Sequence, residues 1–151
     1  MKDYILEQMY ELSSKFYLKY FRKNNPWKIT TKELLLYPTE SLGFHLCCFH
    51  LKYNLEMKPN LEEHDIIHVL TDTGVSVTDE VSLQYLLLGN GKKSPYQFLA
   101  LATGTMFYPT ELKTFRQFYK RGKNSHKFYH LDFQNMLLQP LKELQYTFNI
   151  Q

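Results

Sequence analysis

The sequence predicts an all-α fold, a single-domain bundle of about seven or eight helices that spans residues 1–151. Apolar residues recur at steps of three and four through most of the chain, which is the spacing of an amphipathic helix. Residues that begin or end helices separate these stretches. The alternation typical of a strand occurs only over residues 75–77, which is too short to indicate a sheet. A length of 151 residues fits one domain.

Four of the expected helices lie in the first half of the chain. Helical spacing predicts the first of them, which ends at about Arg22. Capping-box spacing opens the second and the fourth, with Thr30 and Asn60 as the capping side chains. The third is mostly apolar and follows a break at Pro38. The four helices are expected at residues 5–22, 32–37, 39–53 and 61–71.

Glycine and proline divide the second half of the chain in the same way. Gly74 marks a turn, and the Gly-Asn-Gly run at residues 89–91 ends the helix that follows. Pro95 suits the first position of the next helix, where its missing N–H costs nothing. Pro140 interrupts the last stretch, so we expect a kink or two short helices there. The helical stretches are expected at residues 78–88, 95–108, 109–122 and 131–148.

Charge and cysteine content exclude several classes of protein. A net charge of +3 is too weak to indicate nucleic-acid binding. Cys47 and Cys48 are the only cysteines; they give no disulfide framework and are expected in the core, which favours a reducing compartment. Asp3, Glu7 and Glu11 argue against a signal or transit peptide, and no apolar stretch approaches the roughly 18 residues that span a bilayer. We therefore expect a cytoplasmic protein, for which peripheral binding to the inner face of a membrane is compatible with the sequence.

The stretch from His64 to His68 is the most informative part of the sequence. On the predicted helix, the two histidines lie four residues apart and project from one face, which Asp65 borders. Glu80 follows His68 near the start of the next predicted helix, and an antiparallel neighbouring helix would bring its carboxylate back over this face. Two nitrogens and two oxygens predict a four-ligand site for a divalent cation. The residues alone leave a second interpretation equally open, a polar helix face that is exposed to solvent.

Four segments of the sequence resemble the motifs of one known family. They are Tyr-Pro-Thr-Glu-Ser-Leu-Gly at 37–43, His-Asp-x-x-His at 64–68 with Glu80, His-Val-Leu-Thr at 68–71 and Gln-Pro-Leu-Lys-Glu-Leu at 139–144. Together they resemble the Coq-four family, the fourth protein of the coenzyme Q (ubiquinone) biosynthesis series. The resemblance covers about residues 35–151.

The resemblance implies a fold, a cofactor and a role. Members of the family are all-helical and bind zinc, here through His64, Asp65, His68 and Glu80. They also bind a polyprenyl lipid in an apolar channel beside the metal, and they organise biosynthetic enzymes at a membrane. A role in removing the carboxyl group of the prenylated ring precursor and in hydroxylating the ring carbon is implied as well. Because two of the ligands are oxygens, iron and manganese are alternatives to zinc.

The expected partners follow from this resemblance and from composition. They are a polyprenyl lipid or quinone precursor, other quinone-biosynthesis proteins and a membrane surface, with no nucleic acid among them. An aromatic content of 16% makes a homodimer reasonable, because aromatic side chains often supply interface area.

Residues 95–108 form the most apolar of the predicted helices. Two interpretations remain open for it, a buried central helix or the lining of a lipid tunnel or membrane-facing surface. The basic residues at the ends of helices likewise have two interpretations, pairing with lipid phosphates or a solvated charge. The candidate lipid-binding residues are Phe98, Leu101, Ala102, Met106, Lys92 and Lys93.

Two further functions are compatible with the sequence. In one, the protein is a non-catalytic, lipid-binding scaffold whose metal ion pins two helices together. In the other, it is a metal-dependent phosphohydrolase of the HD class, which needs an upstream histidine such as His45 or His50 and a downstream aspartate. A zinc protease is disfavoured, because the motif lacks the glutamate that acts as general base in His-Glu-x-x-His. Outside the HD interpretation, we expect no functional role for His45, His50, His126 or His130.

Overall fold

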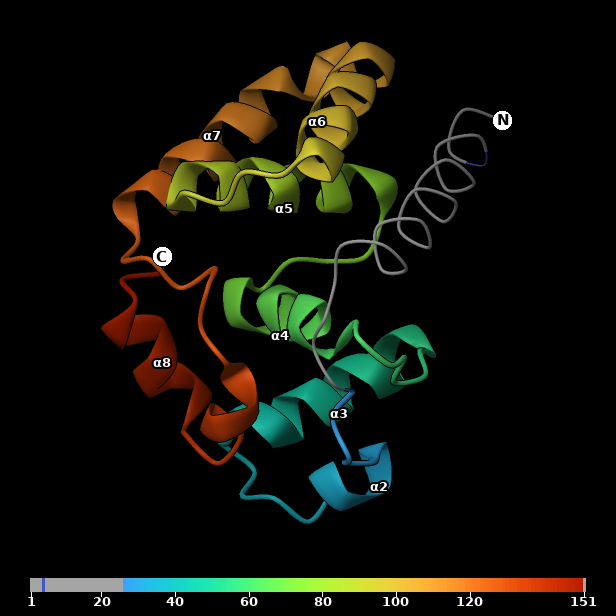
Figure 1. Cartoon of the computed structure of the whole chain (residues 1–151), viewed down its shortest axis with the longest axis vertical. Coiled ribbons are helices and arrows are strands. Elements are labelled where there is room, and N and C mark those ends of the chain that lie inside the picture. Colours follow the sequence, from blue (N-terminus) through green and yellow to red (C-terminus); the bar gives the residue numbers. More distant parts are fainter. Residues whose placement is uncertain (1–3, 5–25, 151) are drawn as a thin grey trace. The chain divides into compact units, whose positions relative to one another are not determined.

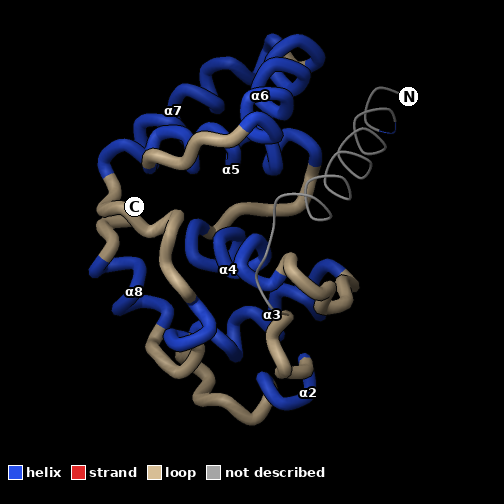
Figure 2. The backbone as a smooth tube through the Cα atoms, in the orientation of Figure 1, coloured by secondary structure: helices blue, strands red, loops and turns tan. Residues whose placement is uncertain are grey.

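The structure is a computed structural model that describes Tyr4 and residues 26–150, and it confirms the predicted all-α fold (Figure 1). The described part contains seven α-helices, two short 3₁₀-helices and no β-strand. Figure 2 colours the described residues as helix or loop throughout. The helix predicted up to Arg22 lies outside the described residues. The α-helices are α2 (Thr31–Leu34), α3 (Leu42–Tyr53), α4 (Glu62–Thr71), α5 (Val77–Asn90), α6 (Pro95–Phe107), α7 (Leu112–Asn124) and α8 (Leu141–Thr147).

The described chain forms two compact units. Residues 74–130 belong to the first, which contains α5, α6 and α7. Residues 26–73 and 131–150 belong to the second, which contains α2, α3, α4 and α8. The second unit is therefore assembled from two stretches of sequence that are separated by the first.

Helix α5 is the centre of the first unit, and both α6 and α7 pack against it (Figure 1). Ser76 opens α5 with a capping box: its Oγ accepts a hydrogen bond from the N–H of Asp79 at 3.2 Å, and the Asp79 carboxylate accepts one from the N–H of Ser76 at 3.1 Å. Gly91 ends the helix in the left-handed conformation, at a φ of 112° that other residues rarely adopt. The predicted end of this helix is thus confirmed.

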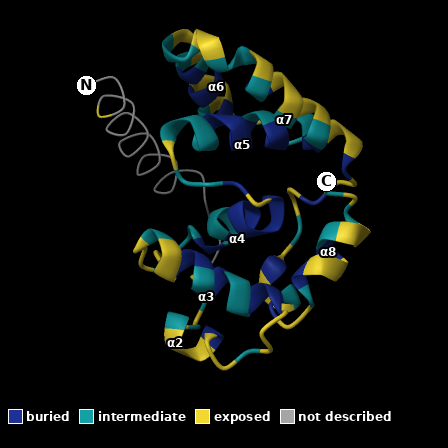
Figure 3. Ribbon diagram, turned by 180° about the vertical axis from the view of Figure 1, so that it is seen from behind, coloured by how far each residue is buried: buried dark blue, intermediate teal, exposed yellow. Residues whose placement is uncertain are grey.

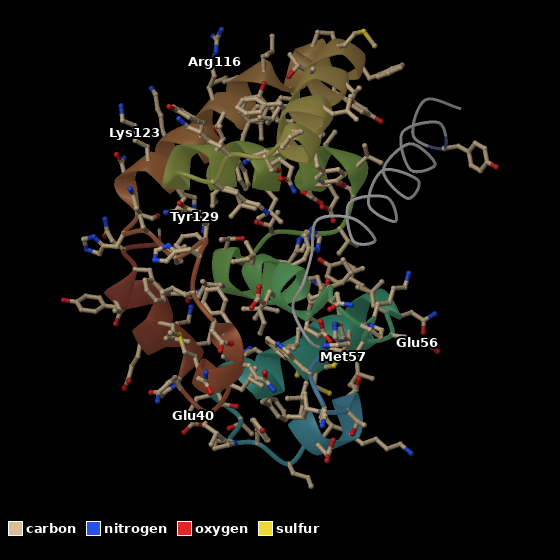
Figure 4. The ribbon with its side chains drawn as sticks, viewed as in Figure 1. Glu40, Glu56, Met57, Arg116, Lys123 and Tyr129 are labelled. Carbon is tan, nitrogen blue, oxygen red and sulfur yellow. The ribbon has the colours of Figure 1, made fainter. Side chains whose placement is uncertain are left out.

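Helix α7 shows clear amphipathic character. Phe115 is fully buried, whereas the basic residues Arg116 and Lys123 project from the exposed side (Figure 4). In Figure 3 the outward side of α7 is mostly exposed, while much of α5 is buried. The basic residues of α7 therefore lie on a solvated face of the first unit.

Two glycines allow α5 and α7 to approach each other closely. A Cβ atom on Gly89 would collide with the carbonyl oxygen of Tyr119, and one on Gly122 would collide with the carbonyl oxygen of Leu86. The expected end of the helix at Gly122 is wrong, because α7 continues to Asn124. This glycine serves helix packing and does not end the helix.

The buried side chain of Asn90 joins the end of α5 to the chain after α7. Its Nδ2 donates to the carbonyl oxygens of Gly122, at 3.2 Å, and His126, at 3.0 Å. Its Oδ1 accepts from the N–H groups of Phe128, at 2.9 Å, and Tyr129, at 3.2 Å. The whole hydrogen-bonding capacity of the amide is used, which fixes the path of this segment.

The second unit begins with the capping box that the sequence predicts. The Oγ1 of Thr30 accepts from the N–H of Glu33 at 3.3 Å, and α2 follows directly, although it ends at Leu34 and is shorter than expected. Ser41 caps α3 in the same way, through a hydrogen bond of 3.2 Å from the N–H of Phe44. These two caps place α2 and α3 where their sequences predict helices.

Backbone hydrogen bonds tie the start of α3 to the segment before α8. The N–H of Leu42 donates to the carbonyl oxygen of Gln139, and the N–H of Leu141 donates to that of Glu40, both at 2.8 Å. The first and the last of the four resemblance motifs therefore meet in the structure. The last helical stretch is split as expected, into a 3₁₀-helix at Phe133–Met136 and α8, with Pro140 at the N-cap of α8.

Helix α4 begins without the cap that the sequence predicts. Asn60 has a φ of 68°, in the left-handed region, and the N-cap is Leu61, which makes no side-chain hydrogen bond there. The predicted capping box from Asn60 to Glu63 is therefore wrong. Acidic residues in the first turn stabilise this helix end instead, through the positive end of the helix dipole.

Candidate metal centre

Helix α4 presents its two histidines on one face, as predicted. The ring centroids of His64 and His68 lie 4.6 Å apart, and one nitrogen of each ring lies within 4.8 Å of the other. The His68 ring is buried, at 1% exposure, whereas the His64 side chain is 31% exposed. This pair combines one fixed nitrogen donor with one that solvent or a ligand can reach.

The turn after α4 and a ring on α3 hold His68. Its Nδ1 lies 3.3 Å from the carbonyl oxygen of Thr73, which places the ring proton on Nδ1 and the lone pair on Nε2. Thr73 is itself fixed, because its N–H donates to the carbonyl oxygen of His68 at 2.9 Å. Phe49 stacks on the His68 ring, with centroids 5.6 Å apart and planes at 25°. A histidine with one nitrogen bonded to a carbonyl and the lone pair on the other is the usual form of a metal ligand.

Asp65 has partners on both of its carboxylate oxygens. Its Oδ2 accepts a hydrogen bond of 2.9 Å from Nε2 of His50, which comes from α3 and is 1% exposed. Its Oδ1 lies 3.5 Å from Nδ1 of His64. No signal in the sequence links His50 to Asp65, because the two residues belong to different helices. Outside the HD interpretation the sequence analysis gave His50 no role, so its contact with Asp65 is what sequence reasoning missed.

These contacts keep Asp65 ionised. Burial by itself favours the neutral acid and raises the pKa of Asp65. Hydrogen bonds from His50 and His64, and the electrostatic attraction of both rings, outweigh burial and lower the pKa below its ordinary value. A negative charge therefore lies beside the two histidines of α4.

Glu80 lies in the first turn of α5, and its side chain is half-buried. His64 and His68 belong to the second unit and Glu80 to the first, so Glu80 stays a predicted third ligand beside the histidine pair. Two imidazoles and a carboxylate are ligands that zinc and iron accept. The role of Asp65 as a fourth ligand likewise stays a prediction.

The candidate lipid-binding residues of α6 divide between two faces. Phe98 and Met106 are 52% and 68% exposed, and Ala102 is exposed beside them. Leu101 is buried at 7% and faces the core of the first unit. Lys92 is half-buried and Lys93 is exposed, just before the helix. Helix α6 therefore contains one buried face and one apolar face that is open to solvent.

The two cysteines were expected in the core. Cys47 is fully buried and Cys48 half-buried, and both are free thiols. Burial, with the neighbouring thiol as a smaller cause, raises the pKa of Cys47, so this side chain is an unreactive part of the core.

Fold and site together define an all-helical protein with a candidate metal centre on α4. The family model of the coenzyme Q (ubiquinone) biosynthesis protein Coq4 matches residues 51–151, about two thirds of the chain. The chain therefore belongs to the Coq4 family.

One solved structure supports the fold independently. The crystal structure of a proposed ubiquinone biosynthesis protein from Nostoc punctiforme has a similar fold, with a TM-score of 0.69 and 18% sequence identity. The similarity covers 95% of this chain and 82% of the Nostoc chain. No curated protein sequence matches the chain. In the described part of the chain, no helix combines the length and the apolar character that crossing a bilayer requires.

Proposed function

We propose that this protein binds one divalent metal ion, with zinc as the first candidate, and supports ubiquinone synthesis by acting on a polyprenylated ring precursor. The proposal is supported chiefly by the histidine pair of α4, whose two rings lie side by side and of which His68 is fixed through Nδ1. The chain that contains this pair belongs to the Coq4 family. In the proposed site His64 and His68 supply nitrogens, Glu80 supplies a carboxylate oxygen, and Asp65 adds negative charge beside them.

The short connection between α4 and α5 supports the assignment of Glu80. Only residues 72–76 separate the two helices, and Glu80 is the fourth residue of α5. Five extended residues span at most about 18 Å, so the connection limits how far the start of α5 can lie from the end of α4. The ligand spacing that the sequence predicts is thus compatible with the observed helix ends.

A bound divalent ion would supply Lewis acidity, stabilising the negative charge that develops on the ring as carbon dioxide leaves. Even without a bound ion, neighbouring residues hold the histidines of the proposed site in position. The carbonyl of Thr73 and the ring of Phe49 fix the orientation of His68. The partial exposure of His64 leaves a side from which a carboxylate substrate can approach.

The first test is a quinone profile with Glu80→Gln. In ubiquinone-making cells that lack their own member of the family, we expect the wild-type chain to restore ubiquinone and Glu80→Gln to lose most of that restoration, because the amide cannot replace an anionic ligand. Ubiquinone is measured by mass spectrometry of lipid extracts.

Glu143→Gln is the matched control for this test. Glu143 is also an acid in the first turn of a helix, α8, and it is exposed. The control removes the same charge from a helix N-terminus without touching the proposed ligands, and it is expected to restore ubiquinone fully. Full restoration by Glu80→Gln would contradict the proposed metal role.

A second measurement separates a catalyst from a scaffold. The purified, metal-loaded protein is incubated with a prenylated hydroxybenzoate, and the released carbon dioxide is measured. Release that depends on His64 and His68 supports a decarboxylase, whereas metal binding without release supports a scaffold. Iron or manganese in the native protein would favour a hydroxylation step, because zinc has no redox chemistry.

We further propose that the exposed face of α6 contacts the lipid. Phe98, Ala102 and Met106 give this face its apolar character, and Lys92 and Lys93 add positive charge that can pair with phosphate groups. Leu101 is excluded from this role because it is buried. Isolated exposed apolar residues are common, so the argument rests on their sharing one helix face.

Replacing Phe98 and Met106 together by serine is expected to weaken binding to vesicles of anionic phospholipid by roughly tenfold or more, because each large apolar side chain contributes on the order of 1 kcal/mol when half-buried in lipid. Binding is measured by co-sedimentation. Leu36→Ser is the control, since Leu36 is 86% exposed and lies outside α6. Equal binding of the double variant and the wild type would exclude this face as the lipid contact.

A further inference from the structure

A buried histidine outside the proposed ligand set needs an explanation. His50 lies on α3 and is 1% exposed, and its one hydrogen bond runs from Nε2 to Oδ2 of Asp65, at 2.9 Å. Its other ring nitrogen, Nδ1, is buried and has no hydrogen-bond partner among the described residues. Burying an imidazole with only one polar contact is costly, and a leucine would fill the core at lower cost. The polar role of His50 therefore resides in its contact with Asp65.

The direction of this hydrogen bond follows from the partner. Because an ionised carboxylate can only accept, Nε2 of His50 carries the proton and donates it. This bond fixes Oδ2 and with it the plane of the Asp65 carboxylate. The other oxygen, Oδ1, then remains directed at Nδ1 of His64, at 3.5 Å.

His50, Asp65 and His64 thus form a chain of contacts that lies wholly within the second unit. A carboxylate that accepts from one ring nitrogen of a ligating histidine fixes its tautomer and ring orientation, and it makes the opposite nitrogen a better donor to metal. With Nδ1 of His64 facing Asp65, a cation would bind this ring through Nε2. His68 has the same arrangement, with the Thr73 carbonyl in the place of the carboxylate.

We propose that His50 is a positioning residue of the metal site: by fixing Asp65, it orients His64 so that Nε2 of that ring faces the ion. This inference rests on the proposed metal function, and in it Asp65 acts on the orientation of His64. His50 acts through Asp65 and touches neither the metal nor the substrate.

The experiment compares His50→Leu, His50→Gln and His45→Leu by zinc titration against a chromophoric chelator. His50→Leu is expected to lower zinc affinity by about 10–100-fold, the usual cost of losing such a supporting contact. In His50→Gln the new side-chain amide nitrogen lies near the position of Nε2 and can donate to Asp65, so this variant is expected to recover most of the affinity. His45→Leu changes a half-buried histidine of the same helix and should bind zinc like the wild type.

Circular dichroism and thermal unfolding of the metal-free variants show whether each of them folds. A folded His50→Leu with wild-type zinc affinity would overturn the positioning role, and so would a His50→Gln that is as weak as His50→Leu. A wild-type chain that binds no zinc, iron or manganese would instead overturn the proposed metal function.

The ring orientation can also be measured without any metal. Nitrogen-15 NMR of the metal-free wild type is expected to show the His64 proton on Nδ1, and the same is expected for His50→Gln. In His50→Leu the proton should shift largely to Nε2, the form that free imidazole side chains favour. An unchanged His64 tautomer in His50→Leu would overturn the inference whatever the zinc titration gives.

Discussion

Replacing His64 or His68 by alanine is expected to abolish stoichiometric metal binding. The purified wild type should contain close to one divalent ion per chain, and each variant close to none, because two nitrogens are the core of the proposed ligand set. The loss of affinity should exceed the roughly 10–100-fold that removal of a supporting contact costs. Metal content is measured by elemental mass spectrometry after purification without chelators.

Two variants are needed because the two histidines differ in burial. His68 is buried and stacked on Phe49, so His68→Ala removes packing as well as a ligand. His64 is 31% exposed, so His64→Ala tests the ligand with little loss of packing. His126→Ala, which changes an exposed histidine of the other unit, should keep its metal. One ion per chain in both α4 variants would exclude the α4 site.

Metal binding should also raise the stability of the wild type. A ligand that binds only the folded state at 100 times its dissociation constant contributes about 2.7 kcal/mol. The wild type is therefore expected to unfold at a higher temperature with zinc than without it, and His64→Ala should show no such difference.

Gly122→Ala is expected to destabilise the protein by about 3 kcal/mol or more, because the new methyl group would collide with a backbone carbonyl of α5 that cannot move aside freely. For a chain of this length the unfolding temperature should fall by roughly 10 °C. The sign of the change in the free energy of unfolding is the informative result. At an exposed helical position without this constraint, glycine to alanine stabilises by about 1 kcal/mol.

Lys120→Ala is the control for the packing prediction. Lys120 is exposed on the same helix, two residues earlier, and its replacement should change the free energy of unfolding by less than about 0.5 kcal/mol. Urea denaturation followed by circular dichroism measures both variants. Gly122→Ala with wild-type or higher stability would show that α5 and α7 lie farther apart than described.

Most of the fold could be predicted from local signals in the sequence. Thr30, Pro95 and Gly91 act at helix ends, where a few neighbouring residues decide the structure. The prediction that Asn60 caps α4 is wrong. Its spacing to Glu63 suits a capping box, but the backbone at Asn60 adopts a left-handed conformation and Leu61 is the N-cap. The prediction that Gly122 ends a helix is wrong for a different reason. This glycine allows close packing against α5, a helix more than thirty residues away in the sequence.

Some features of the candidate metal centre could also be predicted from the sequence, and others could not. The common face of His64 and His68 follows from helical spacing alone, so the sequence sufficed to predict it. The contact between His50 and Asp65 depends on how α3 and α4 pack, which spacing along one helix cannot reveal. The tautomer of His68 likewise depends on the path of the turn at Thr73.

The pairing of residues 40–42 with residues 139–141 has a consequence for biosynthesis on the ribosome. Chains emerge from the N-terminus at about 5–20 residues per second, and segments fold as their partners become available. The α4 histidines are translated well before residues 131–150, so their own unit lacks its C-terminal stretch until that stretch has been made. Metal delivered before then would meet an incomplete unit, so we expect loading to follow synthesis of this stretch.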